Sequence, residues 1–299
     1  MRTAKKRIAF YLIMICCACA ACGKAEEKKL QIVFQYQMDY WDAYDLSGSS
    51  IPDQKEFEAL AQSYIQETEK LLGISGWWEK INPGADTLIL NLCITGETGS
   101  VSRASYGKRA LDNEVEAGIS LGGMALTKYH SDGFLAHELT HVMVGPSFSI
   151  SLEDGLCQYV QGTIGLTSHM PGMKENGIAF EQYFKTYHEY CKISAEEGAA
   201  PKPQDIIDSV GKAGRQYPEG PRMMWMMYSE SFVRYLISQY GTDRTMELII
   251  AGEEEGAYEK ILGKNLTELK DGWISSVEAV EQQYTWEEIG RMEQEFLQK

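Results

Sequence analysis

The distribution of strand and helix patterns constrains the fold of this 299-residue chain more than any other feature. Two aliphatic runs, residues 30–36 and 87–94, have the composition of half-buried or buried strands. Beyond Ser151 almost no strand pattern remains, and apolar residues recur at helical spacing. We therefore expect an α+β fold in which a small mixed sheet, within residues 30–145, precedes a mostly helical part formed by residues 146–299.

Turn and helix signals subdivide the first part. Pro52 and Asp53 predict the start of a helix that runs to about Leu72. Residues 96–107 are rich in Gly and Ser and predict a loop, and a third strand, at an edge of the sheet, is expected over residues 117–123. An open edge of this kind can pair with an extended peptide through main-chain hydrogen bonds.

The first 21 residues have the pattern of a secretory signal rather than of a folded core. Four basic residues precede the apolar run 8–15, and small residues then lead to Cys22. The sequence Cys19-Ala20-Ala21-Cys22 resembles the lipobox of bacterial lipoproteins. This resemblance implies export, lipidation of Cys22 and attachment to the cell membrane on the side facing outside the cytoplasm, with residues 22–29 as a flexible spacer. An ordinary cleaved signal peptide is the alternative, whereas a transmembrane anchor would need about 20 apolar residues.

The charge and the cysteines limit the class of protein further. The chain carries a formal net charge of −15, and removal of a signal would leave it more acidic still. Such a surface argues against nucleic acid as a partner and against docking on anionic lipid. Cys93, Cys157 and Cys191 lie beyond the signal region. Their wide spacing does not predict a disulfide framework, and we expect each to be buried as a small apolar side chain.

The segment His137-Glu138-Leu139-Thr140-His141 has the H-E-x-x-H pattern of zinc metalloproteases. Residues four apart on a helix share one face, so His137 and His141 can direct imidazole nitrogens at one Zn²⁺ ion. Glu138 can then accept a proton from the water that attacks a peptide carbonyl. Gly145 and Pro146 predict the end of this helix. The alternative is a pair of histidines on an ordinary amphipathic helix.

A catalytic zinc site needs a third protein ligand. Residues 151–159, Ser-Leu-Glu-Asp-Gly-Leu-Cys-Gln-Tyr, resemble the W-L-x-E-G-L-A-x-Y segment of gluzincins, in particular of bacterial peptidases of the MA-like group. Aligned on its Leu, Gly, Leu and Tyr, the resemblance implies that Asp154 stands at the position of the ligand Glu, with Glu153 as the reserve. A different interpretation is that Ser151 caps the helix and that both acidic residues only favour its first turn.

Residues 228–241 resemble a further helix of the same group, Y-x-x-x-F-V-R-Y-L-x-x-x-Y-G. The resemblance implies a zincin-like fold and a hydrogen bond from Tyr228 to the developing oxyanion, while a tyrosine that only packs in the core is the alternative. His130, His169 and His188 lack ligand spacing and are expected at the surface or in loops.

Together these features predict an exported, lipid-anchored zinc metallopeptidase that hydrolyses a peptide or protein substrate. Zn²⁺ would be held by His137, His141 and Asp154, with Glu138 as the general base. The alternative from another class is a non-catalytic surface lipoprotein that keeps a peptidase-like fold for protein binding. Residue spacing specifies neither the cleavage preference nor the oligomeric state.

Overall fold

The computed structural model describes residues 30–44, 46, 51–95, 102–111, 113–122, 131–165, 173, 176–216, 221–251 and 256–298. The predicted signal, the predicted lipidation site Cys22 and the spacer lie outside the described residues. Within the described part of the chain, no helix combines the length and the apolar character that crossing a membrane requires.

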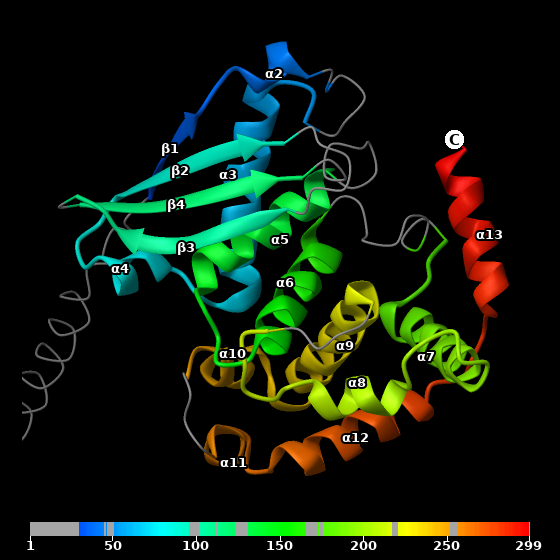
Figure 1. Ribbon diagram of the computed structural model, residues 1–299. Coiled ribbons are helices and arrows are strands. Elements are labelled where there is room, and N and C mark those ends of the chain that lie inside the picture. Colours follow the sequence, from blue (N-terminus) through cyan, green and yellow to red (C-terminus); the bar gives the residue numbers. More distant parts are fainter. Residues whose placement is uncertain are drawn as a thin grey trace, which may run out of the picture.

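Among the described residues, four strands form a small mixed sheet (Figure 1). Their order in the sheet is β1 (Gln31–Tyr36), β2 (Thr87–Ile94), β4 (Glu114–Leu121) and β3 (Arg103–Arg109). The first three are parallel, and β3 pairs with β4 in antiparallel fashion. Buried and half-buried residues alternate along β2 and β4, so one face of the sheet carries the most deeply buried side chains. The predicted α+β class is confirmed.

The strand that the sequence predicts at an edge of the sheet is not an edge strand. Residues 117–121 belong to β4, which lies between β2 and β3, so the prediction of an edge strand there is wrong. The two edge strands are β1 and β3, and β3 lies largely within the segment predicted to be a loop. Its exposed Arg103, Lys108 and Arg109 suit an edge that meets water, and they also remove the apolar alternation that would have revealed a strand.

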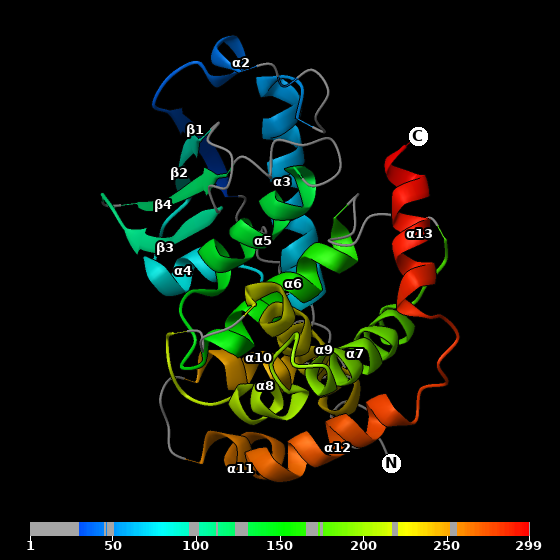
Figure 2. The ribbon, with the colours of Figure 1, turned by 45° about the vertical axis from the view of Figure 1, so that its right-hand side comes forward.

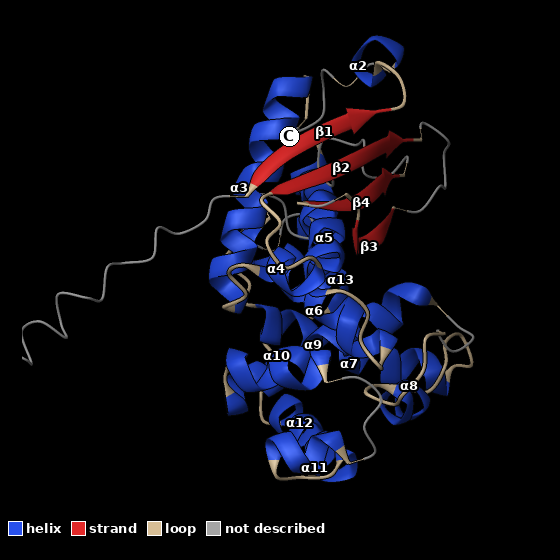
Figure 3. Cartoon of the chain, turned by 90° about the vertical axis from the view of Figure 1, so that its left-hand side faces the viewer, coloured by secondary structure: helices blue, strands red, loops and turns tan. Residues whose placement is uncertain are grey.

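Helices cover one face of the sheet (Figure 3). They are α3 (Gln54–Leu72), α4 (Trp77–Ile81) and α5 (Ser131–Val144), and the short α2 (Tyr40–Ala43) follows β1. The carboxylate of Asp53 accepts a hydrogen bond from the backbone N–H of Glu56 and so caps the start of α3. Gly145, with a φ of 76°, directly follows α5, which confirms the predicted end of that helix.

The remainder of the described chain is mostly helical, as predicted (Figure 2). Its helices are α6 (Ile150–Ile164), α7 (Phe180–Glu196), α8 (Pro203–Ser209), α9 (Arg222–Tyr240), α10 (Thr242–Ile250), α11 (Ala257–Leu262), α12 (Leu266–Glu278) and α13 (Trp286–Leu297). Helix α6 packs against both α5 and α9. The first helix of the helical part therefore lies directly against the helix that carries the H-E-x-x-H motif.

The close contact between α6 and α9 depends on Gly155. A Cβ atom at this position would lie 2.5 Å from the backbone oxygen of Ser229 and 2.9 Å from Cγ2 of Val233. The absence of a side chain thus lets the two helix backbones approach each other. Because Gly155 follows Asp154 directly, this packing also determines the position of Asp154.

Candidate metal centre

His137 and His141 lie one turn apart on α5 and point in the same direction. Their Nε2 atoms are 3.2 Å apart, and their ring centroids are 5.0 Å apart. The apolar neighbours Leu135, Ala136 and Leu139 are fully buried. Their burial fixes the rotation of α5 about its axis, and this rotation directs both imidazoles at α6.

Helix α6 supplies three side chains on the facing surface. Asp154 Oδ1 lies 3.2 Å from His141 Nε2, and Glu153 Oε1 lies 2.9 Å from His141 Nδ1. The buried thiol of Cys157 forms a group with the two histidines in which the ligand atoms all lie within 4.8 Å of one another, and this group can hold a metal ion. Asp154 is not part of that group and is placed beside it by its contact with His141. We call His137, His141, Asp154 and Cys157 together the metal cluster.

Glu153 is not a member of the metal cluster, but it holds His141 through a hydrogen bond. Its Oε1 accepts hydrogen bonds from His141 Nδ1 and from the Tyr106 hydroxyl, at 2.6 Å, and its Oε2 accepts from the backbone N–H of Ser147, at 2.9 Å, and from Arg215. Burial by itself would raise the pKa of this carboxyl, but the four donors outweigh burial and lower the pKa of Glu153 to about 2. A carboxylate that accepts the Nδ1–H of a histidine is the usual outer partner of a metal-binding imidazole.

The contacts of His141 fit a bound cation. With Nδ1–H donated to Glu153, a neutral His141 presents a lone pair at Nε2, and this lone pair lies 3.2 Å from an acceptor, Asp154 Oδ1. Ligand atoms of a tetrahedral zinc ion at about 2.0–2.1 Å would be about 3.3 Å apart, close to the two contacts of 3.2 Å made by His141 Nε2. Asp154 Oδ2 is buried without a hydrogen bond to any described residue.

The protonation of the histidines agrees with this arrangement. Burial lowers the pKa of His137 to about 3 and keeps this imidazole neutral, as a metal ligand must be. Burial also opposes a charged His141, but Cys157, Asp154 and Glu153 outweigh burial and raise the pKa of His141 well above its usual value. The surroundings of His141 thus favour a positive charge at Nε2, whether it is brought by a proton or by a metal ion.

Glu138 lies beside the first histidine of the motif and is only 4% exposed. Burial raises the pKa of its carboxyl to about 7. A carboxylate with a pKa near neutrality can both accept and release a proton under physiological conditions. Such a pKa is suitable for a general base.

Ser151 does not cap α6, so this part of the capping interpretation is wrong, although Glu153 does lie in the first turn. The N-cap of α6 is Ser149, and Ser151 lies inside the helix, where its hydroxyl accepts a hydrogen bond from the backbone N–H of Gly211 at 2.7 Å. Asp154 is therefore one turn into α6 and contacts His141. Cys157 was not predicted as a ligand, although its position three residues after Asp154 places it on the same face of the helix.

Tyr228 lies in the core of the helical part. It is fully buried, its hydroxyl is 2.8 Å from His188 Nδ1, and its ring packs on Phe184 of α7 and Trp273 of α12. These contacts are those expected of a tyrosine that packs in the core. His188 is itself only 1% exposed within α7, so the prediction that it lies at the surface or in a loop is wrong. His130 and His169 lie outside the described residues.

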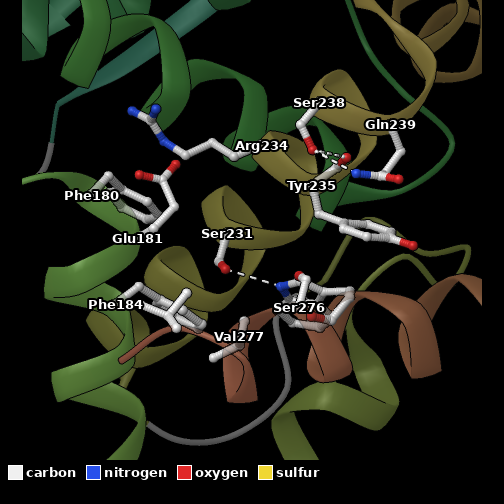
Figure 4. A pocket seen from close by; sticks show the side chains of 12 residues that line it. Phe180, Glu181, Phe184, Ser231, Arg234, Tyr235, Ser238, Gln239, Ser276 and Val277 are labelled. Carbon is white, nitrogen blue, oxygen red and sulfur yellow. Dashed lines mark hydrogen bonds between the residues drawn. The ribbon is translucent and has the colours of Figure 1, made fainter. Parts of the chain in front are cut away.

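A separate cavity of about 220 Å³ lies between α7, α9 and α12 (Figure 4). Phe180, Phe184 and Trp273 give it apolar walls. Arg234, which also lines it, donates a hydrogen bond from Nε to Glu230 Oε1 at 2.8 Å and lies 4.3 Å from the ring centre of Phe180. The lining contains no member of the metal cluster, and Arg234 already interacts with Glu230 and Phe180. This cavity therefore adds no chemistry to the metal centre.

No protein-family model, no curated protein and no solved structure matches this chain. Its function is therefore inferred from the residues of the site itself. Within the described part of the chain, the metal cluster with Glu138 beside it is the arrangement with the most specific chemistry.

Proposed function

We propose that the protein is a zinc-dependent metallopeptidase in which His137, His141 and Asp154 bind the ion and Glu138 is the general base. The observation that carries this proposal is the contact of His141 Nε2 with both His137 Nε2 and Asp154 Oδ1, each at 3.2 Å. The H-E-x-x-H pattern supports it independently. Asp154 is assigned as the ligand rather than Glu153, because four donors already occupy the oxygens of Glu153.

Bound zinc would lower the pKa of a coordinated water and polarise the carbonyl of the substrate. Glu138 accepts a proton from the attacking water, for which its pKa of about 7 is suitable, and then donates this proton to the leaving amine. Glu153 holds His141 in the tautomer that leaves Nε2 available as a ligand. Glu138 thus transfers the proton, and Glu153 orients a ligand.

The open edge of the sheet supports a polypeptide substrate. Tyr106 belongs to the edge strand β3, its hydroxyl donates to Glu153, and its ring centroid lies 6.5 Å from that of His141. The edge therefore borders the metal centre. If an extended peptide paired with β3 through main-chain hydrogen bonds, its scissile bond would lie near the two histidines.

The N-terminal pattern supports an exported enzyme that a lipid at Cys22 holds on the membrane. Its substrates would then be peptides or proteins outside the cytoplasm. The net charge of −15 supports a partner other than nucleic acid.

The purified protein is expected to contain about one zinc ion per chain, as a single site of this kind predicts, and to cleave an unfolded protein such as casein. Removal of the metal by a chelator should abolish cleavage, and added Zn²⁺ should restore it. Metal content is measured by atomic absorption, and cleavage by the release of acid-soluble peptides. Casein cleavage that persists in zinc-free protein would contradict the proposal. Stoichiometric zinc without cleavage would favour the non-catalytic alternative.

Asp154→Ala is expected to lower the zinc affinity much more than Glu153→Ala. The first change removes a ligand, whereas the second removes an outer partner, a loss that typically costs about 10–100-fold in metal affinity. Competition between the protein and a chelator of known affinity gives both values. Asp154→Asn is the matched variant, because it keeps the size of the side chain but not its charge. A larger effect at Glu153 would show that the third ligand is assigned one residue too late.

A further inference from the structure

Cys157 is the one member of the metal cluster that the proposed mechanism does not use. Its thiol is 1% exposed, it lies on α6 three residues after Asp154, and its sulfur is within 4.8 Å of ligand nitrogens of both His137 and His141. The described cysteines are all outside disulfides. Cys191, in contrast, interacts with the tyrosines Tyr187 and Tyr228.

The donor set around the two histidines has the composition of a complete zinc site. Zinc combines readily with imidazole, carboxylate and thiolate ligands, and a thiol that binds it loses its proton. Helix α5 offers two nitrogens, and α6 offers a carboxylate and a sulfur one turn apart on the facing side. A thiolate buried at this depth needs a neighbouring positive charge, and an ion held by the two histidines would supply it.

We propose that Cys157 is a fourth protein ligand, so that the resting ion is held by His137, His141, Asp154 and Cys157. This inference rests on the proposed function and concerns the control of the same site. Zinc sites with four protein ligands are closed, whereas catalytic zinc sites keep one position for water. The unchanged protein therefore works below its full rate, because the attacking water can bind the ion only in those molecules whose Cys157 thiolate has left it.

Cobalt substitution tests this ligand without any assay of activity. Protein loaded with one Co²⁺ per chain is expected to show the near-ultraviolet absorption of thiolate-to-cobalt charge transfer. Cys157→Ser should lose this absorption and still bind one Co²⁺ through the remaining ligands. Cys191→Ser is the matched control, because it also replaces a buried cysteine, and it should keep the absorption. All other cysteines of the chain are present in both variants.

The outcomes separate this inference from the proposed function. Stoichiometric cobalt in the unchanged protein without charge-transfer absorption would overturn the role of Cys157 and leave the metallopeptidase proposal in place. No bound metal at all would overturn both. Cys157→Ala provides a second variant if the serine disturbs folding, which circular dichroism reports. In cleavage assays this alanine variant should hydrolyse casein faster than the unchanged protein, and a slower rate would contradict the inhibitory role of Cys157.

Discussion

Glu138→Gln is expected to abolish casein cleavage while about one zinc ion per chain remains bound, as a single site predicts. Glutamine keeps the shape of the side chain but cannot accept a proton from the attacking water. General-base catalysis typically contributes about 10²–10⁴-fold to the rate, so the variant should lose at least that much. Its zinc content should not change, because Glu138 is not among the proposed ligands. Peptide release and atomic absorption on the same preparation measure both quantities.

The exposed Glu67 on α3 provides a control for this exchange. Glu67→Gln is expected to leave both cleavage and zinc content unchanged, since Glu67 is not part of the metal centre. Two results would count against the proposed mechanism. Undiminished cleavage by Glu138→Gln would show that another group accepts the proton, and loss of zinc would show that Glu138 is itself a ligand.

Gly155→Ala is expected to destabilise the folded protein by about 1–3 kcal/mol, the typical cost of overfilling a packed contact. The new Cβ would lie 2.5 Å from the oxygen and 2.7 Å from the carbon of the Ser229 carbonyl. Both atoms belong to the backbone of α9, so no rotation of a side chain can relieve the overlap. The helices must separate instead. Because Asp154 precedes Gly155 directly, zinc affinity should fall together with the midpoint of urea unfolding.

Gly290 in α13 is the matched control, because a Cβ atom there would meet nothing within 4 Å. Gly290→Ala should stabilise its helix by about 0.5–1 kcal/mol, since alanine loses less backbone entropy than glycine. The two variants thus make the same chemical change, but one is expected to lower and the other to raise the stability of the folded protein. An unchanged or higher unfolding midpoint for Gly155→Ala would show that α6 and α9 do not require this close approach.

The sequence allowed the sheet, the motif helix and the helical remainder to be predicted. In each of them, apolar residues recur at regular spacing or a residue such as glycine marks the end of the element. Helix α5 is the clearest case, with Gly145 at its end. Strand β3 could not be found in this way. An edge strand meets water on much of its surface, so a polar sequence such as Arg-Ala-Ser-Tyr-Gly-Lys-Arg is suitable for it and has no strand period.

The candidate site was predicted less completely than the fold. Helical spacing predicts that His137 and His141 share a face, and this is confirmed. Spacing cannot tell which acidic residue of a second helix lies nearer to an imidazole nitrogen, because that depends on the distance and rotation between the helices. The role of Glu153 depends on Arg215, which lies 62 residues further along the chain. No local pattern connects the two residues.

The position of α6 has a consequence for how the protein assembles. The two histidines are encoded before residue 145, and the facing carboxylates and thiol are encoded after it. Neither half of the chain can therefore form the metal centre alone. In a growing chain, α5 is made first, and the proposed ion would gain its full set of ligands only once α6 has docked. Tight metal capture would in this way distinguish a chain in which α6 has docked on α5 from one in which it has not.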